Sequence, residues 1–174
     1  MSMLKLRYAL TFIVLSIFIL VGFASVDSQS RLINVDYSDL TKDARKQVDC
    51  LAENIYHEAG YEPETGKQAV ALVTLNRTQD ERFPQSICGV VKQKTQGTCQ
   101  FSWFCLPVKL NRNTEAYRQS LDAALYVYAN YEKLKDITDG ALYYHADYVN
   151  PRWRNVEKTT VIGRHIFYKE KTKL

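Results

Sequence analysis

The sequence predicts an α+β domain that is mostly helical, with a small antiparallel sheet near the C-terminus. Two helical patterns fill residues 43–77, and a third long one follows Thr114. After residue 140 the apolar residues change to the period of strands. The 174 residues, 24% of them charged and 46% hydrophobic, suffice for one globular domain with a sizeable core.

The N-terminus carries an uncharged stretch, Tyr8 to Val26, which follows two basic residues. Such a stretch is either a signal peptide, cut here after Ala24, or an uncleaved membrane anchor with the domain outside. Both alternatives predict export to the periplasm or cell envelope, or secretion. We expect three parts: an export segment at 1–26, a linker at 27–42 and the functional domain at 43–174.

Charge and cysteine content agree with export. Removal of the first 24 residues takes away two of the 23 Lys and Arg and none of the 19 Asp and Glu. The remaining net charge is too small to indicate a nucleic-acid partner. An even number of cysteines in an exported chain predicts two disulfides among Cys50, Cys88, Cys99 and Cys105. Three pairings are possible, and we favour Cys88–Cys99 with Cys50–Cys105.

The first predicted helix, residues 43–59, has one narrow apolar face. At about 100° per residue, this face holds Val48, Leu51, Ala52, Ile55 and Ala59. Glu58 lies on its flank, where partial burial would raise the pKa of the carboxyl, as a general acid requires. The alternative is a solvated glutamate near a helix end.

The second predicted helix covers residues 68–77. Gly60 ends the first helix, and Thr65 with Gln68 has the pattern of a capping box for the second. Its apolar residues surround the whole circumference, which predicts a buried central helix. We expect Arg77, at its end, to have a structural role and to pair with a carboxylate.

The middle of the chain is less regular. A short helical turn is expected at 85–91, whereas residues 92–110 have no clear period. A loop of this length in a compact domain is usually functional. Thr114 then caps the third long helix. A strand is predicted at 141–145.

A hairpin completes the predicted sheet. Residues 159–162 and 165–169 flank Gly163-Arg164, and glycine at the first position of a two-residue loop fits a type II′ turn.

The residues favour carboxylate chemistry over other kinds. The zinc-binding pattern that His57-Glu58 begins is broken at Tyr61, and His57 points away from Glu58. His57, His145 and His165 could still gather around a metal, but we predict no metal and no other cofactor. Nucleophilic catalysis by Cys88 or Cys105 conflicts with disulfide formation.

Several other acids and aromatic residues are candidates for a sugar-cleaving site. Glycosidases usually need two carboxyl groups, and Asp147 is a possible second acid beside Glu58, whereas Glu62 and Glu64 suit the N-terminus of the next helix. Sugar clefts combine stacking rings with amides. Such groups are frequent in the irregular segments. We expect Phe101 and Tyr143 to be buried. The better cleft candidates are Trp103, Tyr144 and Trp153.

Blocks of this sequence resemble the SleB/CwlJ-like cell-wall hydrolase family, in order and spacing, over roughly residues 48–169. The blocks are Leu51–Ala59, Gly66–Ala71 leading to Asn76-Arg77, Phe83–Cys88, Cys99–Trp103, Tyr144-His145 followed by Asn150–Trp153, and Ile162–Tyr168.

The resemblance implies a fold similar to lysozyme and lytic transglycosylases and an enzyme that cleaves peptidoglycan. It places the catalytic acid at Glu58 and implies cleavage between N-acetylmuramic acid and N-acetylglucosamine, as a lytic transglycosylase with one carboxylate. The residues expected to bind the strand are Gln100, Ser102, Trp103, Tyr144, His145 and Trp153. The expected partners are peptidoglycan and, for an uncleaved anchor, the membrane; we expect a monomer.

Three alternatives stay open at this point. They are muramidase-type hydrolysis, a metal-dependent peptidoglycan amidase or peptidase, and a non-catalytic wall-binding protein.

Overall fold

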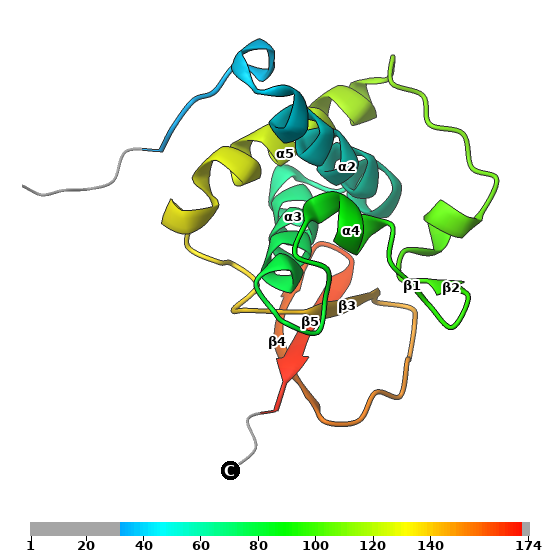
Figure 1. The fold of residues 1–174 in the computed structure, drawn as a ribbon. Helices are drawn as coiled ribbons and strands as arrows, with labels where there is room; N and C mark the ends of the chain where they lie inside the picture. The colour runs from blue at the N-terminus through cyan, green and yellow to red at the C-terminus, as the bar shows by residue number, and fades with distance from the viewer. Residues whose placement is uncertain (1–31, 172–174) are drawn as a thin grey trace, which may run out of the picture. The chain divides into compact units, whose positions relative to one another are not determined.

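A computed structural model describes residues 32–171, so the predicted export segment lies outside the described residues. Within 32–171, no helix is both long and apolar enough to cross a membrane. The helices pack together and a three-stranded sheet lies against them (Figure 1). The predicted mostly helical α+β class, with its sheet near the C-terminus, is confirmed.

Helix α2, Lys42–Ala59, begins at Thr41, whose hydroxyl accepts a hydrogen bond from the Ala44 amide. Its predicted apolar face is buried and packs against α3, α4 and α5. Helix α3, Glu64–Thr78, is the predicted buried central helix, but it begins earlier than expected. The predicted capping box is wrong, because Gln68 instead donates to Glu64 one turn back, at 3.0 Å.

The segment after α3 is short and irregular. Helix α4, Ile87–Val91, is capped by the Ser86 hydroxyl. The loop expected at 92–110 contains a small hairpin, β1 Lys94–Thr95 and β2 Thr98–Cys99, and the 3-10 helix η2 Ser102–Cys105. Helix α5, Glu115–Asn130, is capped by Thr114 as predicted, and η3, Tyr131–Lys133, follows it.

The sheet is antiparallel and has the strand order β3-β5-β4. Its strands are β3 Tyr143–Ala146, β4 Val156–Ile162 and β5 His165–Glu170. Gly163 opens the predicted two-residue turn with a φ of 56°. A Cβ at this position would also collide with the Glu62 carboxylate.

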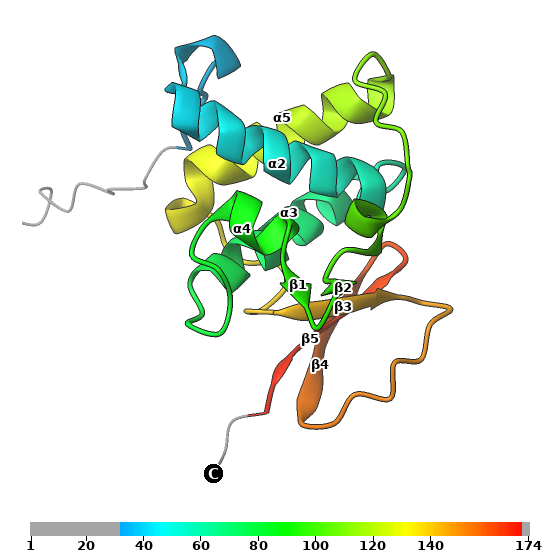
Figure 2. The same ribbon diagram turned by 45° about the vertical axis from the view of Figure 1, so that its right-hand side comes forward.

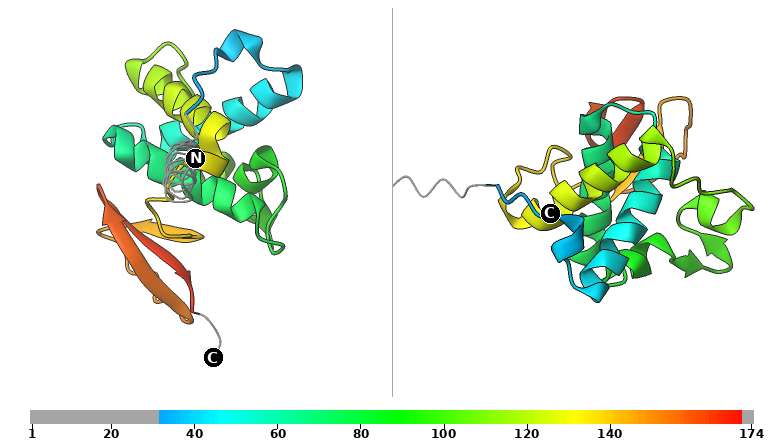
Figure 3. Two further views of the ribbon diagram at one scale, coloured as in Figure 1. Left: turned by 90° about the vertical axis from the view of Figure 1, so that its left-hand side faces the viewer. Right: turned by 90° about the horizontal axis from the view of Figure 1, so that it is seen from above.

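The sheet is attached to the helices through α3. Phe167 of β5 is fully buried against Ala69 and Val73 of α3. Figures 2 and 3 show the sheet on one side of the helices. The strands therefore carry one face toward the helical core and one face away from it.

The four cysteines form two disulfides, as predicted, but the favoured pairing is wrong. The bridges join Cys50 to Cys88 and Cys99 to Cys105. Helix α4 packs on α2 and brings the Cα atoms of Cys50 and Cys88 to 5.2 Å. The short 3-10 helix η2 brings Cys105 back to Cys99, which lies six residues earlier in the chain.

Residues before α2 also pack on the helices. The backbone of Ile33 exchanges two hydrogen bonds with the Asn130 side chain. The Tyr37 hydroxyl, in the 3-10 helix η1 (Tyr37–Asp39), donates to Asp49 at 2.7 Å. Part of the stretch expected to be a linker is thus held against the domain.

Candidate active site

Glu58 lies in the last turn of α2, half-buried where the helices meet the sheet. The Tyr144 hydroxyl, from β3, donates a hydrogen bond to its Oε2 at 3.1 Å. Burial is the largest influence and raises the pKa of Glu58, while the Tyr144 hydroxyl and the nearby Arg77 charge oppose it. Burial also raises the pKa of Tyr144 well above its usual value, so its hydroxyl remains a donor.

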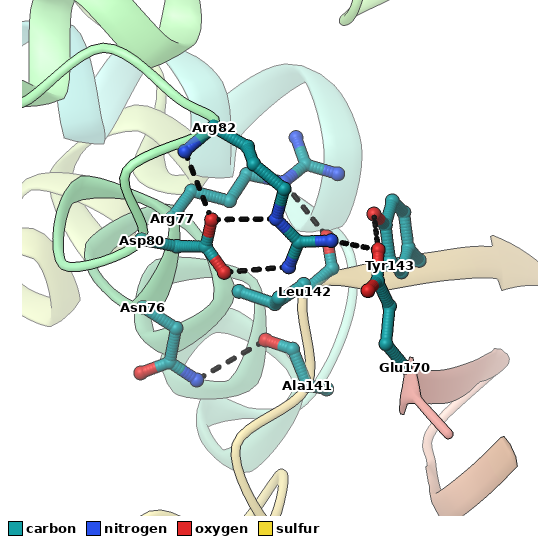
Figure 4. A network of polar contacts seen from close by, with 8 residues as sticks. All are labelled: Asn76, Arg77, Asp80, Arg82, Ala141, Leu142, Tyr143 and Glu170. Carbon is teal, nitrogen blue, oxygen red and sulfur yellow. Dashed lines mark hydrogen bonds and ion pairs between the residues drawn. The ribbon is translucent and has the colours of Figure 1, made fainter. Parts of the chain in front are cut away.

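Arg77 supplies the positive charge near this carboxyl from the end of α3. Its side chain is 6% exposed, and its Nε donates to the Leu142 carbonyl at 2.8 Å (Figure 4). The guanidinium carbon lies 5.3 Å from the ring centroids of both Phe83 and Phe101. Within residues 32–171 it forms no ion pair, so the expected carboxylate pairing is wrong; a carbonyl and two rings take that place.

The neighbouring Asn76 fixes the same chain segment. Its Nδ2 donates to the Ala141 carbonyl at 3.1 Å and to Asp136 at 2.8 Å, and its Oδ1 accepts from the Tyr131 hydroxyl. Figure 4 shows Asn76 and Arg77 bonding to successive carbonyls, those of Ala141 and Leu142. These bonds hold the start of β3, and with it Tyr144, against the end of α3.

A second network in the same region joins the loop after α3 to the sheet. Arg82 pairs with Asp80 and with Glu170 of β5. The Tyr143 hydroxyl donates to Glu170 at 3.1 Å. The Tyr143 hydroxyl therefore belongs to this outer network (Figure 4). The hydroxyl of its neighbour Tyr144 instead bonds to Glu58.

Trp103 is held beside α2 by a residue that the sequence interpretation missed. Asn54, fully buried one turn before Glu58, accepts a hydrogen bond from Trp103 Nε1 at 3.1 Å and donates to Thr74 at 3.2 Å. The Trp103 ring stacks on His57 with 4.4 Å between centroids. A polar residue on the apolar flank of a predicted helix was the signal that could have identified Asn54.

The other expected substrate-binding residues do not all gather near Glu58. Tyr144 points toward the helices, with its ring 5.2 Å from that of the buried His165. His145, the next residue of β3, stacks on Tyr168 and contacts Trp153 on the opposite face. Gln100 and Ser102 are exposed at the start of η2. Phe101 is buried as predicted, while Tyr143 is only half-buried.

The remaining acids are occupied elsewhere. Asp147 is exposed and pairs with Arg164 at 3.3 Å. The Glu62 carboxylate accepts a hydrogen bond from the Arg164 amide in the β4–β5 turn. In the described part of the chain, no three His, Cys, Asp or Glu side chains are placed to hold a metal ion.

These features define a class of site. One carboxyl, with a pKa raised by burial, lies beside an aromatic wall at a helix–sheet junction. This arrangement suits general acid catalysis on a bond of a large, hydroxylated substrate.

Comparison with known proteins agrees with this class. Residues 61–168 match the family described as Cell Wall Hydrolase, and the chain belongs to this family. The catalytic domain of Bacillus cereus SleB is similar, with 28% identity, a TM-score of 0.53, and coverage of 75% of this chain and 94% of that one. The catalytic domain of the germination-specific lytic transglycosylase SleB from Bacillus anthracis is also similar, with 27% identity and a TM-score of 0.53. This match covers 75% of this chain and 98% of that one. No curated protein matches.

The chain is therefore a cell wall hydrolase with a SleB-like fold, which confirms the family resemblance seen in the sequence. A cell wall hydrolase acts outside the cytoplasm, in agreement with export. The family match begins at Tyr61, after Glu58. Glu58 therefore lies just outside the segment that this match covers.

Proposed function

We propose that this enzyme cleaves peptidoglycan glycan strands between N-acetylmuramic acid and N-acetylglucosamine, as a lytic transglycosylase with Glu58 as its single acid–base residue. The observation that carries the proposal is the half-buried Glu58 carboxyl with the Tyr144 hydroxyl on its Oε2. The description of the similar Bacillus anthracis protein as a lytic transglycosylase supports the reaction type.

The first step uses the protonated form of Glu58. Its proton passes to the glycosidic oxygen, the bond from this oxygen to muramic C1 breaks, and an oxocarbenium-like species forms. Burial favours the protonated carboxyl before this step. The Tyr144 hydroxyl and the Arg77 charge stabilise the carboxylate that the step leaves behind.

The second step uses the same carboxylate as a base. Glu58 accepts the proton of the muramic C6 hydroxyl while that oxygen attacks C1 and closes a 1,6-anhydro ring. The substrate supplies its own nucleophile, so one acid suffices. Asp147 is paired with the exposed Arg164, and Glu62 bonds to the hairpin turn. These contacts support a mechanism in which neither Asp147 nor Glu62 acts as a second acid.

Trp103 is suited to bind the sugar chain, because it stacks on His57, the residue next to Glu58 in α2. Its ring is fixed from behind by Asn54 and His57, so little side-chain entropy is lost when a sugar stacks on it.

The test is mass spectrometry of fragments released from purified cell wall in ¹⁸O-labelled water. Anhydro-muramic ends without label are expected, together with a fall of roughly 10²–10⁴-fold in cleavage for Glu58→Gln. Glu62→Gln is the matched control, one turn further along the chain, and should retain most activity. Labelled reducing ends would show hydrolysis by a muramidase mechanism, and a fully active Glu58→Gln would refute the role of Glu58.

A further inference from the structure

The face of the sheet that points away from the helices carries a cluster of four rings. The Trp153 ring lies 5.8 Å from Tyr143, 5.6 Å from His145 and 5.6 Å from Tyr168, measured between centroids. His145 Nε2 also forms a hydrogen bond with the Tyr168 hydroxyl, at 3.0 Å. We call Tyr143, His145, Trp153 and Tyr168 the outer aromatic cluster.

The outer aromatic cluster is separated from Glu58 by the sheet itself. Side chains alternate between the two faces of a strand, so Tyr144 points to Glu58 while Tyr143 and His145 point the other way. The register agrees, because Tyr144 pairs with the buried Phe167 and Tyr143 pairs with Tyr168. The cluster is thus outside the proposed catalytic cleft.

A pocket of about 560 Å³ opens beside this cluster. Tyr143 and Trp153 supply aromatic walls, Asn155 an amide, and Arg154 and Lys171 donors of hydrogen bonds. The volume lies within the range of small-ligand sites. Rings that stack on the apolar faces of sugars, together with amides and cations that bond to hydroxyl and acetamido groups, are the chemistry of carbohydrate binding.

The loop between β3 and β4 holds Trp153 on the surface at a conformational cost. Arg152, just before it, has a φ of 52°, in the left-handed region that a long non-glycine side chain rarely adopts. Asn155, two residues after it, has a φ of 62°, which asparagine tolerates better. Trp153 remains 42% exposed. A strained loop that displays a large ring next to a pocket points to a ligand rather than to core packing.

We propose that the outer aromatic cluster is a second glycan-binding site, which holds another segment of the peptidoglycan strand and keeps the enzyme on the wall. This inference rests on the proposed function. A polymer substrate presents the same hexosamine unit many times, so one enzyme can hold it at two places. The ligand expected is a neutral N-acetylated hexosamine chain.

The test measures cosedimentation of the full chain with purified, insoluble cell wall, in a Glu58→Gln background that does not consume the wall. Trp153→Ala should weaken binding about 3- to 10-fold, the range expected for one lost stacking contact. Trp153→Phe retains a ring and should restore much of it. Tyr148→Ala is the matched control, because Tyr148 is a 78% exposed ring of the same loop that does not line the pocket.

A second readout separates this site from the catalytic cleft. With Glu58 intact, Trp153→Ala should slow the release of fragments from intact wall at least threefold more than it slows cleavage of short soluble strands. Equal losses on both substrates would place Trp153 in the cleft and overturn the proposal, as would unchanged wall binding by a folded Trp153→Ala variant. Failure of the proposed function itself would show differently, as wild-type digests that contain no cleaved glycan.

Discussion

Tyr144→Phe tests the electrostatics of the proposed acid most directly. The change removes one hydroxyl, which donates to Glu58 at 3.1 Å and favours its charged form. The ring keeps its packing against His165 and Phe167. Loss of the hydrogen bond should raise the pKa of Glu58 further, so the acid stays protonated to higher pH.

The size of the effect follows from the free energy of that bond. A hydrogen bond of this kind contributes about 1 kcal/mol, and 1.36 kcal/mol corresponds to one pH unit. The alkaline limb of the pH–rate profile should therefore move upward by roughly half to one pH unit. The assay is release of soluble glycan fragments from purified wall between pH 4 and 9.

Tyr143→Phe is the control for this experiment. It removes a hydroxyl from the adjacent residue, but that hydroxyl donates to Glu170 on the other face of the strand. Its alkaline limb should stay where the wild-type limb lies. A downward movement for Tyr144→Phe, or equal movements for both variants, would refute the idea that the Tyr144 hydroxyl adjusts the proton affinity of Glu58.

Three further outcomes are expected. Because burial raises the pKa of Glu58, the wild-type domain loses stability as the pH rises through that pKa. In thermal melts from pH 4 to 8, the melting temperature of Glu58→Gln should therefore rise relative to that of wild type. A difference in melting temperature that stays constant with pH would refute the burial argument. Thiol labelling of the denatured, unreduced protein should give almost no signal, and loss of the Cys50–Cys88 bridge should cost about 2–4 kcal/mol in denaturant unfolding. Asn54→Ala should cost about 2–4 kcal/mol and free the Trp103 ring, seen as altered tryptophan emission.

The elements that the sequence predicts well are those with local causes. The apolar stripe of α2 locates Glu58 at the edge of the core, and Thr114 and Gly163 mark a helix start and a hairpin turn by their own backbone chemistry. Each of these signals depends on residues within one or two turns of the chain. The predicted capping box of Thr65 and Gln68 is wrong, because Gln68 bonds to Glu64, the residue before Thr65.

The disulfide pairing could not be read from the spacing alone. It depends on α4 packing against α2, which brings Cys88 to Cys50, and on η2 returning Cys105 to Cys99. Nothing local to the cysteines specifies either contact.

The separation of Tyr144 from His145 has a different origin. Tyr144 and His145 are adjacent, and both were expected to bind the glycan strand. The same sequence predicts a strand there, and in a strand adjacent side chains point to opposite faces. The periodicity that located the strand therefore already separated the two residues, and only Tyr144 reaches Glu58.

Burial raises the pKa of Glu58, and groups from two elements that no local pattern connects to α2 oppose that rise. Helix α2 supplies the carboxyl, β3 supplies the Tyr144 hydroxyl, and α3 supplies the Arg77 charge. Asn76 and Arg77 bond to the carbonyls of Ala141 and Leu142, which directly precede β3 (Figure 4). Arg77, whose charge lowers the pKa of Glu58, thus also fixes β3, the strand that carries the Tyr144 hydroxyl. A disturbance at the end of α3 would change both influences together, so variants of Arg77 and Tyr144 should be non-additive in their effect on the pH profile.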